Sequence, residues 1–222
     1  MRQRLITNFN SIQEWKDYCF SNHSLYLKNR HFRKWIGKKE ICIFNFSNLS
    51  KNGLRCIKLG IEDAIKIAKL HFKIRYGDHA KLGEIIKINH EKINSVKLLK
   101  MIIKKRKEGG EEHANVCILK NQIVSADVVI RDGEALTFVS EGVILFTFDA
   151  FKTYSSKFLR RRAKHEALHM LGLNIHHEDT KVIGYKDAMC IMKYNAPTIH
   201  ICEKCKDALK SFWSGIKYAT EK

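Results

Sequence analysis

The chain has 222 residues, 45% of them hydrophobic, with 41 Lys and Arg against 23 Asp and Glu, a formal charge of +18. This length and apolar content suit a globular protein of one or two domains. No apolar run approaches the roughly 20 residues of a membrane-spanning helix, and the basic N-terminus lacks the apolar segment of a secretory signal. We therefore expect a cytoplasmic protein without a membrane partner, whose positive charge makes nucleic acid an alternative partner.

The first half of the chain alternates between helical and extended patterns. Ser11 and Glu14 have the spacing of a capping box at the start of a helix. The segments predicted to be helical are 11–19, 61–72 and 93–107, the last of them ended by Gly109 and Gly110. Branched and aromatic residues predict strands at 40–46 and 54–59.

The second half, after residue 110, predicts short strands separated by turns such as Asp132-Gly133. The strands are expected at 116–119, 128–130, 136–139 and 143–148. Ser155 or Ser156 then has the position of an N-cap for a helix that carries the most informative motif of the chain. The chain is therefore expected to form helices on a mixed sheet, followed by this helix and by an irregular C-terminal part. This order indicates the α+β class, with an α/β-like N-terminal part.

The motif HExxH is formed by His165, Glu166 and His169. Two histidines four residues apart lie on one face of a helix, so both imidazoles can bind one metal ion, and Glu166 can reach a metal-bound water as a general base. Gly172 can end the helix and redirect the chain, because glycine accepts left-handed backbone angles. A third histidine after that turn would leave one open position on zinc, as in catalytic sites. The alternative is a solvated helix face without a metal.

A second group of candidate ligands contains Cys202 and Cys205, which form a CxxC motif, together with Cys190 and His177. Two thiolates at this spacing converge on one ion, and the other two residues would complete a Cys₃His site for structural zinc. The alternatives are ordinary reduced thiols, or a redox dithiol, which requires a strand before the motif and a long helix from it. Four further cysteines are scattered singly, which fits a reducing compartment and burial as small apolar residues. They are Cys19, Cys42, Cys56 and Cys117.

From His165 to Cys205 the chain resembles the archaemetzincin family of zinc peptidases, whose pattern is HExxHxxG, an adjacent histidine and cysteine, a cysteine-x-methionine and a final CxxC. The resemblance implies a metzincin-like mixed sheet with flanking helices, a zinc-binding active-site helix, and a small irregular C-terminal part with a structural zinc site. Residues 1–172 would form the N-terminal subdomain, which ends in the active-site helix, and 173–222 the C-terminal subdomain. Residues 1–35 are basic and are a candidate added segment.

The resemblance also implies roles for the matching residues. His176 would join His165 and His169 as the third ligand of a catalytic zinc, with Glu166 as the general base. His177 would take the place of the family's adjacent cysteine and join the structural site. The family places its third histidine three residues after the glycine, whereas this chain has one extra residue before His176.

Two residues downstream complete the implied site. Met192 would be the methionine of the Met-turn. Tyr194 lies two residues later, where astacins place a tyrosine that binds zinc or steadies the oxyanion, and packing beside the turn is its alternative role. The segment between His177 and Cys190 is longer than the family pattern, and the segment between Met192 and Cys202 is shorter.

These patterns together predict a zinc-dependent metallopeptidase with two zinc ions per chain, one catalytic and one structural. Its substrate, a peptide or protein, is expected to lie extended along a sheet edge at 136–139 or 143–148. One alternative is a basic nucleic-acid-binding protein with a structural zinc module. Another is a catalytically degenerate metzincin, in which the displaced third histidine no longer completes the catalytic site.

Overall fold

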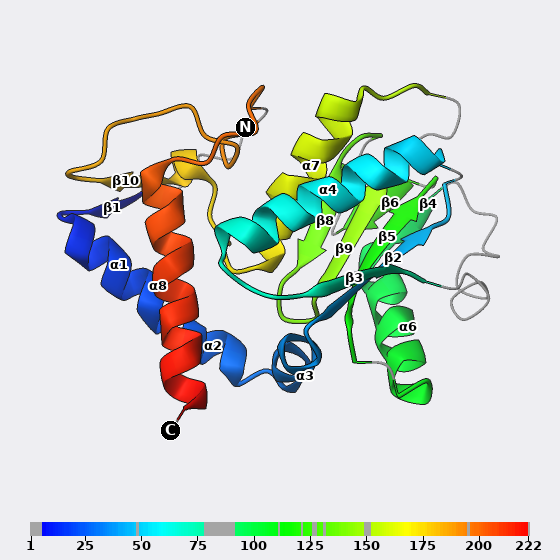
Figure 1. Ribbon diagram of the computed structural model, residues 1–222, viewed down its shortest axis with the longest axis horizontal. Helices are drawn as coiled ribbons and strands as arrows, with labels where there is room; N and C mark the ends of the chain where they lie inside the picture. The colour runs from blue at the N-terminus through cyan, green and yellow to red at the C-terminus, as the bar shows by residue number, and fades with distance from the viewer. Residues whose placement is uncertain are drawn as a thin grey trace.

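A five-stranded sheet lies at the centre of the larger part of the computed structural model (Figure 1). The structure describes residues 6–47, 49–77, 92–110, 112–120, 122–125, 128–130, 132–148, 152–194 and 196–221. The sheet has the order β3-β2-β5-β9-β8, and its neighbouring strands are parallel except for β8 and β9. Its strands are β2 (Glu40–Asn45), β3 (Lys73–Tyr76), β5 (Ala114–Leu119), β8 (Ala135–Phe138) and β9 (Val143–Thr147).

The two faces of this sheet are covered by different helices, because side chains of successive strand residues point to opposite faces. One face packs against α4 (Lys51–Ile67) and α7 (Ser156–Met170), and the other packs against α6 (Ser95–Glu108). On β2, for example, Ile43 belongs to the core under α4 and α7, whereas Phe44 belongs to the core under α6. This burial on both faces explains why the parallel strands read as nearly continuous apolar runs.

The first and last segments of the chain form a second group of elements. β1 (Thr7–Phe9) pairs in parallel with β10 (Thr180–Val182), and α1 (Ile12–Ser21) and α2 (His23–Leu27) pack against α8 (Glu203–Thr220). Figure 1 shows the blue N-terminal helices beside the red C-terminal helix. The candidate added segment 1–35, of which residues 1–5 lie outside the described residues, therefore contacts the part of the chain after residue 172. The division of the chain at residue 172 stays a prediction.

The remaining described elements are the helix α3 and several short segments. β4, β6 and β7 form a separate three-stranded sheet, and a 3₁₀ turn η1 precedes β10. Their bounds are α3 (Arg30–Lys38), β4 (Lys92–Asn94), β6 (Gln122–Ser125), β7 (Val128–Ile130) and η1 (His177–Asp179).

The α+β class is confirmed, and so are most of the predicted elements. Ser11 caps α1 by accepting a hydrogen bond from the Glu14 N–H at 3.1 Å. Ser155, rather than Ser156, caps α7 by accepting one from the Phe158 N–H at 3.2 Å. The strands predicted after residue 110 correspond to β5, β7, β8 and β9. Cys19, Cys42, Cys56 and Cys117 are all buried, as expected.

The strand predicted at 54–59 is wrong, because this segment lies within α4. Ser50 accepts a hydrogen bond from the Gly53 N–H at 3.1 Å and so begins a helix just before the segment. Ile57 and Ile61 are then one turn apart on the same helix face and are completely buried in the core. A short apolar run fits a helix or a strand equally well, and the cap with its following turn decides between them.

Two further features differ from the prediction, the end of one helix and the content of the C-terminal part. The helix predicted over 61–72 ends at Ile67, and the chain reverses with Lys69 in a left-handed conformation, φ 55°. The C-terminal part, predicted to be irregular, contains the 18-residue helix α8. Its apolar face packs against α1, which lies almost the whole chain length away.

Gly60 allows α4 to approach α7 closely, because a Cβ at this position would collide with the carbonyl oxygen of Arg160. We expect Gly60→Ala to lower the free energy of unfolding by about 2 kcal/mol, since the two packed helices must move apart. Gly37→Ala is the matched control, because no atom lies within 4 Å of a Cβ on this exposed helix position, and alanine there should stabilise by about 0.5–1 kcal/mol. Urea unfolding measures both changes, and equal stabilisation by both substitutions would contradict the close approach.

Over the described residues, every helix is too short or too polar to cross a lipid bilayer.

Candidate metal centres

The histidines and the glutamate of the HExxH motif lie on α7, which packs against α4 and the sheet. His165 and Glu166 are buried at 7% and 5% exposure, although a buried polar group is unfavourable unless it has a partner. This burial excludes the alternative of a solvated helix face for these two residues. The side chains of His165 and Glu166 therefore point into the protein and not into solvent.

The histidine cluster consists of His165, His169 and His176, which each offer a ring nitrogen, all within 4.8 Å of one another. The Nδ1 atoms of His165 and His169 lie 2.7 Å from the Ile191 carbonyl oxygen and 2.5 Å from the Leu173 carbonyl oxygen. A carbonyl accepts only, so both Nδ1 atoms carry the proton, and the two Nε2 atoms face each other with lone pairs at 3.1 Å. Opposed lone pairs favour a cation between them, and carbonyl-anchored imidazoles are the usual partners of zinc.

Burial favours the neutral form of the His165 and His176 imidazoles. Loss of solvation lowers the pKa of His165 to about 4, and it lowers the pKa of His176 to about 4 as well. Neutral imidazoles have a free lone pair at neutral pH, which is the state that binds a metal ion.

The turn after α7 brings His176 into the cluster despite the extra residue in the loop. Gly172 has φ 111°, and the Leu173 and Gly172 N–H groups donate to the carbonyl oxygens of Leu168 and His169 at 3.0 and 2.9 Å. This is the Schellman end of a helix, and it turns the chain back toward the ends of the histidine side chains. The ring of His176 then lies 4.8 Å from that of His169, centre to centre.

Glu166 lies beside the histidines with defined partners for its carboxylate. Its Oε2 atom accepts a hydrogen bond from Thr137 Oγ1 on β8 at 2.8 Å, and Arg162 Nε lies 3.9 Å from Oε1. Burial alone would raise the pKa of Glu166, but the electrostatic interactions with His165, His169 and Arg162 and the hydrogen bond from Thr137 outweigh it, so the pKa is lowered. The carboxylate is therefore ionised and able to accept a proton.

A cavity of about 530 Å³ opens over this cluster and runs along β8. Within the described part of the chain, β8 pairs only with β9, so its other edge is free at the cavity. β9 pairs on both sides, with β5 and with β8, and the alternative substrate edge at 143–148 is therefore wrong. The residues that line the cavity are Tyr26, Glu134, Ala135, Leu136, Thr137, Val139, Arg162, His165, Glu166, His169, Asn174, His176 and Tyr194.

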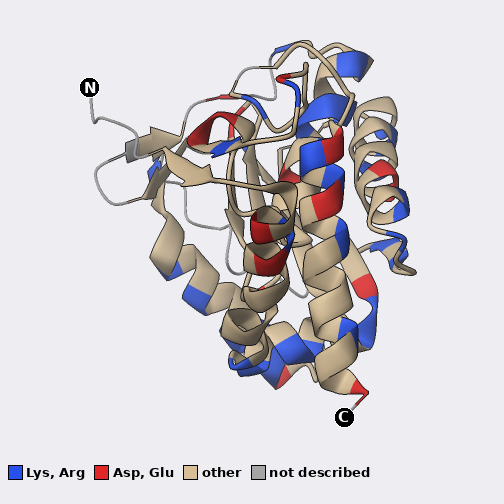
Figure 2. Cartoon of the chain, turned by 90° about the vertical axis from the view of Figure 1, so that its left-hand side faces the viewer, with Lys and Arg blue, Asp and Glu red and all other residues tan. Residues whose placement is uncertain are grey.

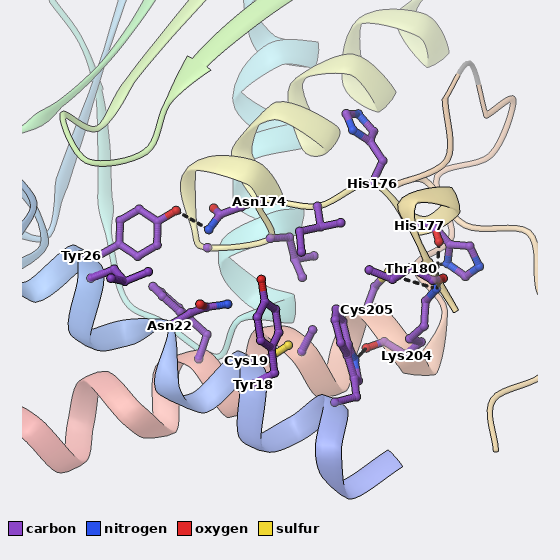
Figure 3. Close-up of a pocket in the computed structure, with 17 residues that line it drawn as sticks. Tyr18, Cys19, Asn22, Tyr26, Asn174, His176, His177, Thr180, Lys204 and Cys205 are labelled. Atoms are coloured by element: carbon purple, nitrogen blue, oxygen red, sulfur yellow. Dashed lines mark hydrogen bonds between the residues drawn. The ribbon is translucent and has the colours of Figure 1, made fainter. Parts of the chain in front are cut away.

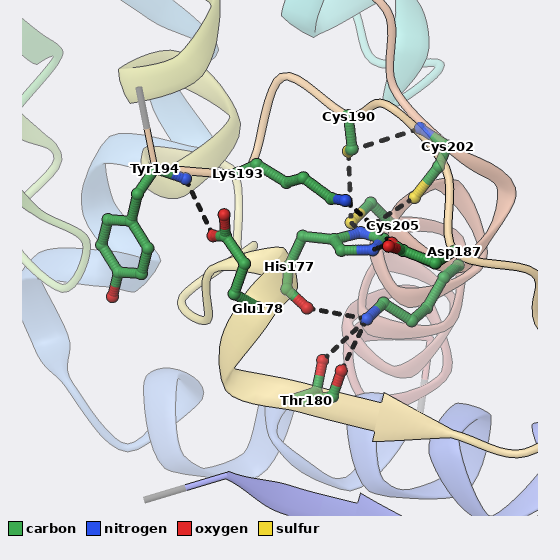
Figure 4. Close-up of polar contacts among 10 residues, drawn as sticks. His177, Glu178, Thr180, Asp187, Cys190, Lys193, Tyr194, Cys202 and Cys205 are labelled. Carbon is green, nitrogen blue, oxygen red and sulfur yellow. Dashed lines mark hydrogen bonds and ion pairs between the residues drawn. The ribbon is translucent and has the colours of Figure 1, made fainter. Parts of the chain in front are cut away.

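The cysteine cluster, which we define as His177, Cys190, Cys202 and Cys205, is buried, and its four ligand atoms lie within 4.8 Å of one another (Figure 4). Cys190 Sγ is 3.7 Å from Cys205 Sγ, and His177 Nδ1 is 3.2 Å from Cys202 Sγ. Zinc–sulfur bonds of about 2.3 Å in a tetrahedron place two sulfurs about 3.8 Å apart, so the donor set fits zinc. Hydrogen bonds to Cys190 and Cys202 raise the pKa of His177 to about 9, so the thiols favour a positive charge among them.

Two further contacts support the metal interpretation of the cysteine cluster. His177 Nε2 lies 3.1 Å from Asp187 Oδ1, which leaves Nδ1 as the ligand atom and supplies the carboxylate partner common around zinc-bound histidines. Cys202 is the N-cap residue of α8 and Cys205 lies in its first turn, so one helix end holds both thiols of the CxxC motif. A redox dithiol would also need a strand before the motif, and the described residues from Ile183 to Ile201 form none.

Met192 and Tyr194 lie between the two clusters. Met192 is completely buried, and its carbonyl oxygen accepts a hydrogen bond from the His177 N–H at 2.9 Å. The ring of Tyr194 stacks on His176 at 3.9 Å between centres, and its hydroxyl donates to Asp179 Oδ2 at 2.8 Å. Tyr194 therefore packs against a candidate ligand and also lines the cavity over the histidine cluster.

A second cavity, of about 180 Å³, lies between α1, α2, α8 and the loop after α7 (Figure 3). Figure 3 shows the ring of His176 pointing away from it. Tyr26 and Asn174 form a hydrogen bond at its rim, and both residues also line the larger cavity. The N-terminal helices thus contact the loop that carries His176.

Several residues around the clusters have no motif by which the sequence could identify them. Thr137, Asp179 and Asp187 come from three different segments, and only folding brings them to the sites. Arg162 had one available signal, since it precedes Glu166 by four residues and so lies on the same face of α7.

No protein-family model matches the chain, and no curated protein matches it. Among solved structures, the crystal structure of archaemetzincin from Methanopyrus kandleri is similar, with a TM-score of 0.51 and 13% sequence identity. The similarity covers 80% of this chain and 95% of that one. Identity this low is evidence for the fold alone. The chain has an archaemetzincin-like fold, and this fold brings together a histidine cluster and a cysteine cluster that are suited to metal ions.

Proposed function

We propose that the protein is a zinc-dependent metallopeptidase. His165, His169 and His176 would hold a catalytic zinc, and the cysteine cluster would hold a structural one. The observation that supports this most directly is the pair of Nε2 atoms of His165 and His169, 3.1 Å apart, beside the buried carboxylate of Glu166 in one cavity. A cluster with a purely structural role would have no use for that carboxylate.

Zinc, when bound, would polarise the scissile carbonyl and acidify the attacking water. Glu166 would take the proton from this water on Oε1, because Oε2 is engaged by Thr137, and would then pass it to the leaving amine. Thr137 and Arg162 would hold the carboxylate in place. The substrate, a peptide or protein, would lie extended along the free edge of β8, where main-chain hydrogen bonds can align it.

Zinc content and chelation test this proposal. We expect two zinc ions per chain by elemental analysis of protein purified without chelators, and hydrolysis of unstructured peptides that is lost after chelation and restored by zinc. Zinc should restore hydrolysis only when His176 is intact. His176→Ala is expected to bind one zinc ion fewer per chain. Two bound ions without hydrolysis of any peptide would instead support a degenerate metzincin.

The charge of +18 favours nucleic-acid binding as the second candidate function. Figure 2 shows Lys and Arg spread over several helices with acidic residues among them. Salt-sensitive binding to DNA or RNA that survives Glu166→Gln and is lost after Cys202→Ser would support this alternative.

A further inference from the structure

His176 and His177 are adjacent in the chain but belong to different clusters. Consecutive Cα atoms are held about 3.8 Å apart by a planar peptide unit, so neither imidazole can be placed without constraining the other. His165 and His169 are fixed by α7, whereas His176 is in a loop. The position of His176 therefore depends on what holds the segment 176–180, which we call the bridging segment.

Lys204 ties the bridging segment to the cysteine cluster. It lies inside the CxxC motif and is buried, and its ammonium group donates to three acceptors on this segment (Figure 3). Nζ donates to the His177 carbonyl oxygen at 2.9 Å, to the Thr180 carbonyl oxygen at 2.8 Å and to Thr180 Oγ1 at 3.1 Å. A buried ammonium group needs all three of these acceptors. The bridging segment and the CxxC motif at the start of α8 are therefore held in a fixed position relative to each other.

Tyr194 holds the other end of the bridging segment and the ring of His176. Its backbone N–H donates to Glu178 Oε2 at 2.8 Å, while its hydroxyl donates to Asp179 Oδ2 at the same distance. Asp179 Oδ2 is 3.9 Å from His176 Nδ1. In His165 and His169 the corresponding Nδ1 atom faces a backbone carbonyl oxygen. The Tyr194 ring covers the face of His176. His176 thus has a carboxylate and an aromatic ring around it, both anchored through the bridging segment.

We propose that the cysteine cluster positions the third ligand of the histidine cluster. Metal bound by the cysteine cluster would fix the bridging segment and so tighten metal binding by the histidine cluster, with Lys204 and Tyr194 as positioning residues. The inference rests on the proposed function, because it uses both metal assignments. Coupling of this kind is reciprocal and typically changes affinity about 5- to 150-fold, so we expect about tenfold here.

The first test compares the unmodified protein with Cys202→Ser, both after removal of metal. One equivalent of Cd²⁺, which prefers thiolates, is added to the unmodified protein to fill its cysteine cluster, whereas the cluster of the variant lacks one thiolate and stays empty. Both proteins are then titrated with Co²⁺. Thiolate-to-metal charge-transfer absorption reports the cysteine cluster, and visible Co²⁺ absorption in the Cd²⁺-loaded sample reports the histidine cluster. We expect Co²⁺ to bind the histidine cluster about tenfold more tightly when Cd²⁺ is present. Equal affinity in both samples would overturn the coupling.

The second test removes the contacts of Lys204. Lys204→Met keeps the length and the apolar stem of the side chain, so the cysteine cluster should still fill with Cd²⁺. The histidine cluster should then bind Co²⁺ about tenfold more weakly than in the unmodified protein. Lys206→Met is the matched control, because the Lys206 ammonium group forms an ion pair with Glu203 at the surface. The Co²⁺ affinity of the histidine cluster should be unchanged in this variant.

Each failure has its own meaning in these titrations. If the histidine cluster binds no Co²⁺ in either sample, both the proposed function and the coupling fail. If it binds Co²⁺ equally with and without Cd²⁺, or if Lys204→Met binds as tightly as Lys206→Met, only the coupling fails. The comparison between the Cd²⁺-loaded protein and Cys202→Ser does not depend on whether the Lys204 variant folds.

Discussion

Glu166→Gln is expected to abolish peptide hydrolysis while both clusters keep their zinc. Glutamine has the same shape and its carbonyl oxygen can still accept the hydrogen bond from Thr137, but it cannot take a proton from water. Proton transfer by a positioned side chain contributes about 10²- to 10⁴-fold, so we expect kcat to fall by about 10³-fold or more. Peptide cleavage followed by mass spectrometry, with zinc content measured on the same preparation, checks both parts.

Glu62→Gln is the control for this substitution. Glu62 is on the exposed side of α4, where it forms an ion pair with Lys58 at 3.6 Å. Unlike Glu166, it is not buried. Its variant should keep full activity. Full activity in Glu166→Gln would show that the assigned general base is wrong, and loss of zinc in that variant would show that the carboxylate acts on metal binding instead.

Cys205→Ser is expected to cause the largest loss of stability. Cys205 is buried against Cys190 and His177, and serine replaces a thiolate ligand by a much weaker one. A ligand present at 1,000 times its Kd stabilises the folded state by about 4 kcal/mol, and the variant would lose most of this if zinc no longer bound. The midpoint of thermal unfolding with zinc present should therefore fall clearly below that of the unmodified protein.

Cys56→Ser separates the loss of metal from the loss of a buried sulfur. Cys56 is also buried but lies on α4, outside both clusters. We expect it to lower the free energy of unfolding by about 1 kcal/mol, and by the same amount with or without a chelator. The difference between Cys205→Ser and the unmodified protein should shrink when zinc is chelated. A difference that persists unchanged in chelator would mean that the cysteine cluster is stabilised by packing alone.

Local pattern was sufficient wherever the information lies within a few residues. The spacing of His165 and His169 places both rings on one helix face, because the helical period is 3.6 residues. The cap at Ser11 likewise follows from residues within one turn, and the same kind of pattern narrowed the cap of α7 to Ser155 or Ser156. The error at 54–59 has the same physical origin, because a short apolar run satisfies two periods and the deciding cap at Ser50 lies just outside it.

Non-local contacts could not be derived in this way. Nothing in the pattern shows that α8 forms a long helix against α1, since the residues in contact are separated by most of the chain. The same holds for Lys204, whose three acceptors lie 24 to 27 residues before it. Pairings over such distances depend on how the elements pack, and packing is settled by the whole chain together.

The donor types follow from the amino-acid pattern: histidines on one helix face, a glutamate among them, a CxxC motif and a histidine pair. Local periodicity and thiolate chemistry sufficed for that. The loop after α7 had to fold in its surroundings before His176 could reach the histidine cluster across the extra loop residue and His177 could face Cys202. That outcome depends on the left-handed turn at Gly172 and on the contacts that Lys204 and Tyr194 make with the bridging segment, because loop conformation follows from its surroundings.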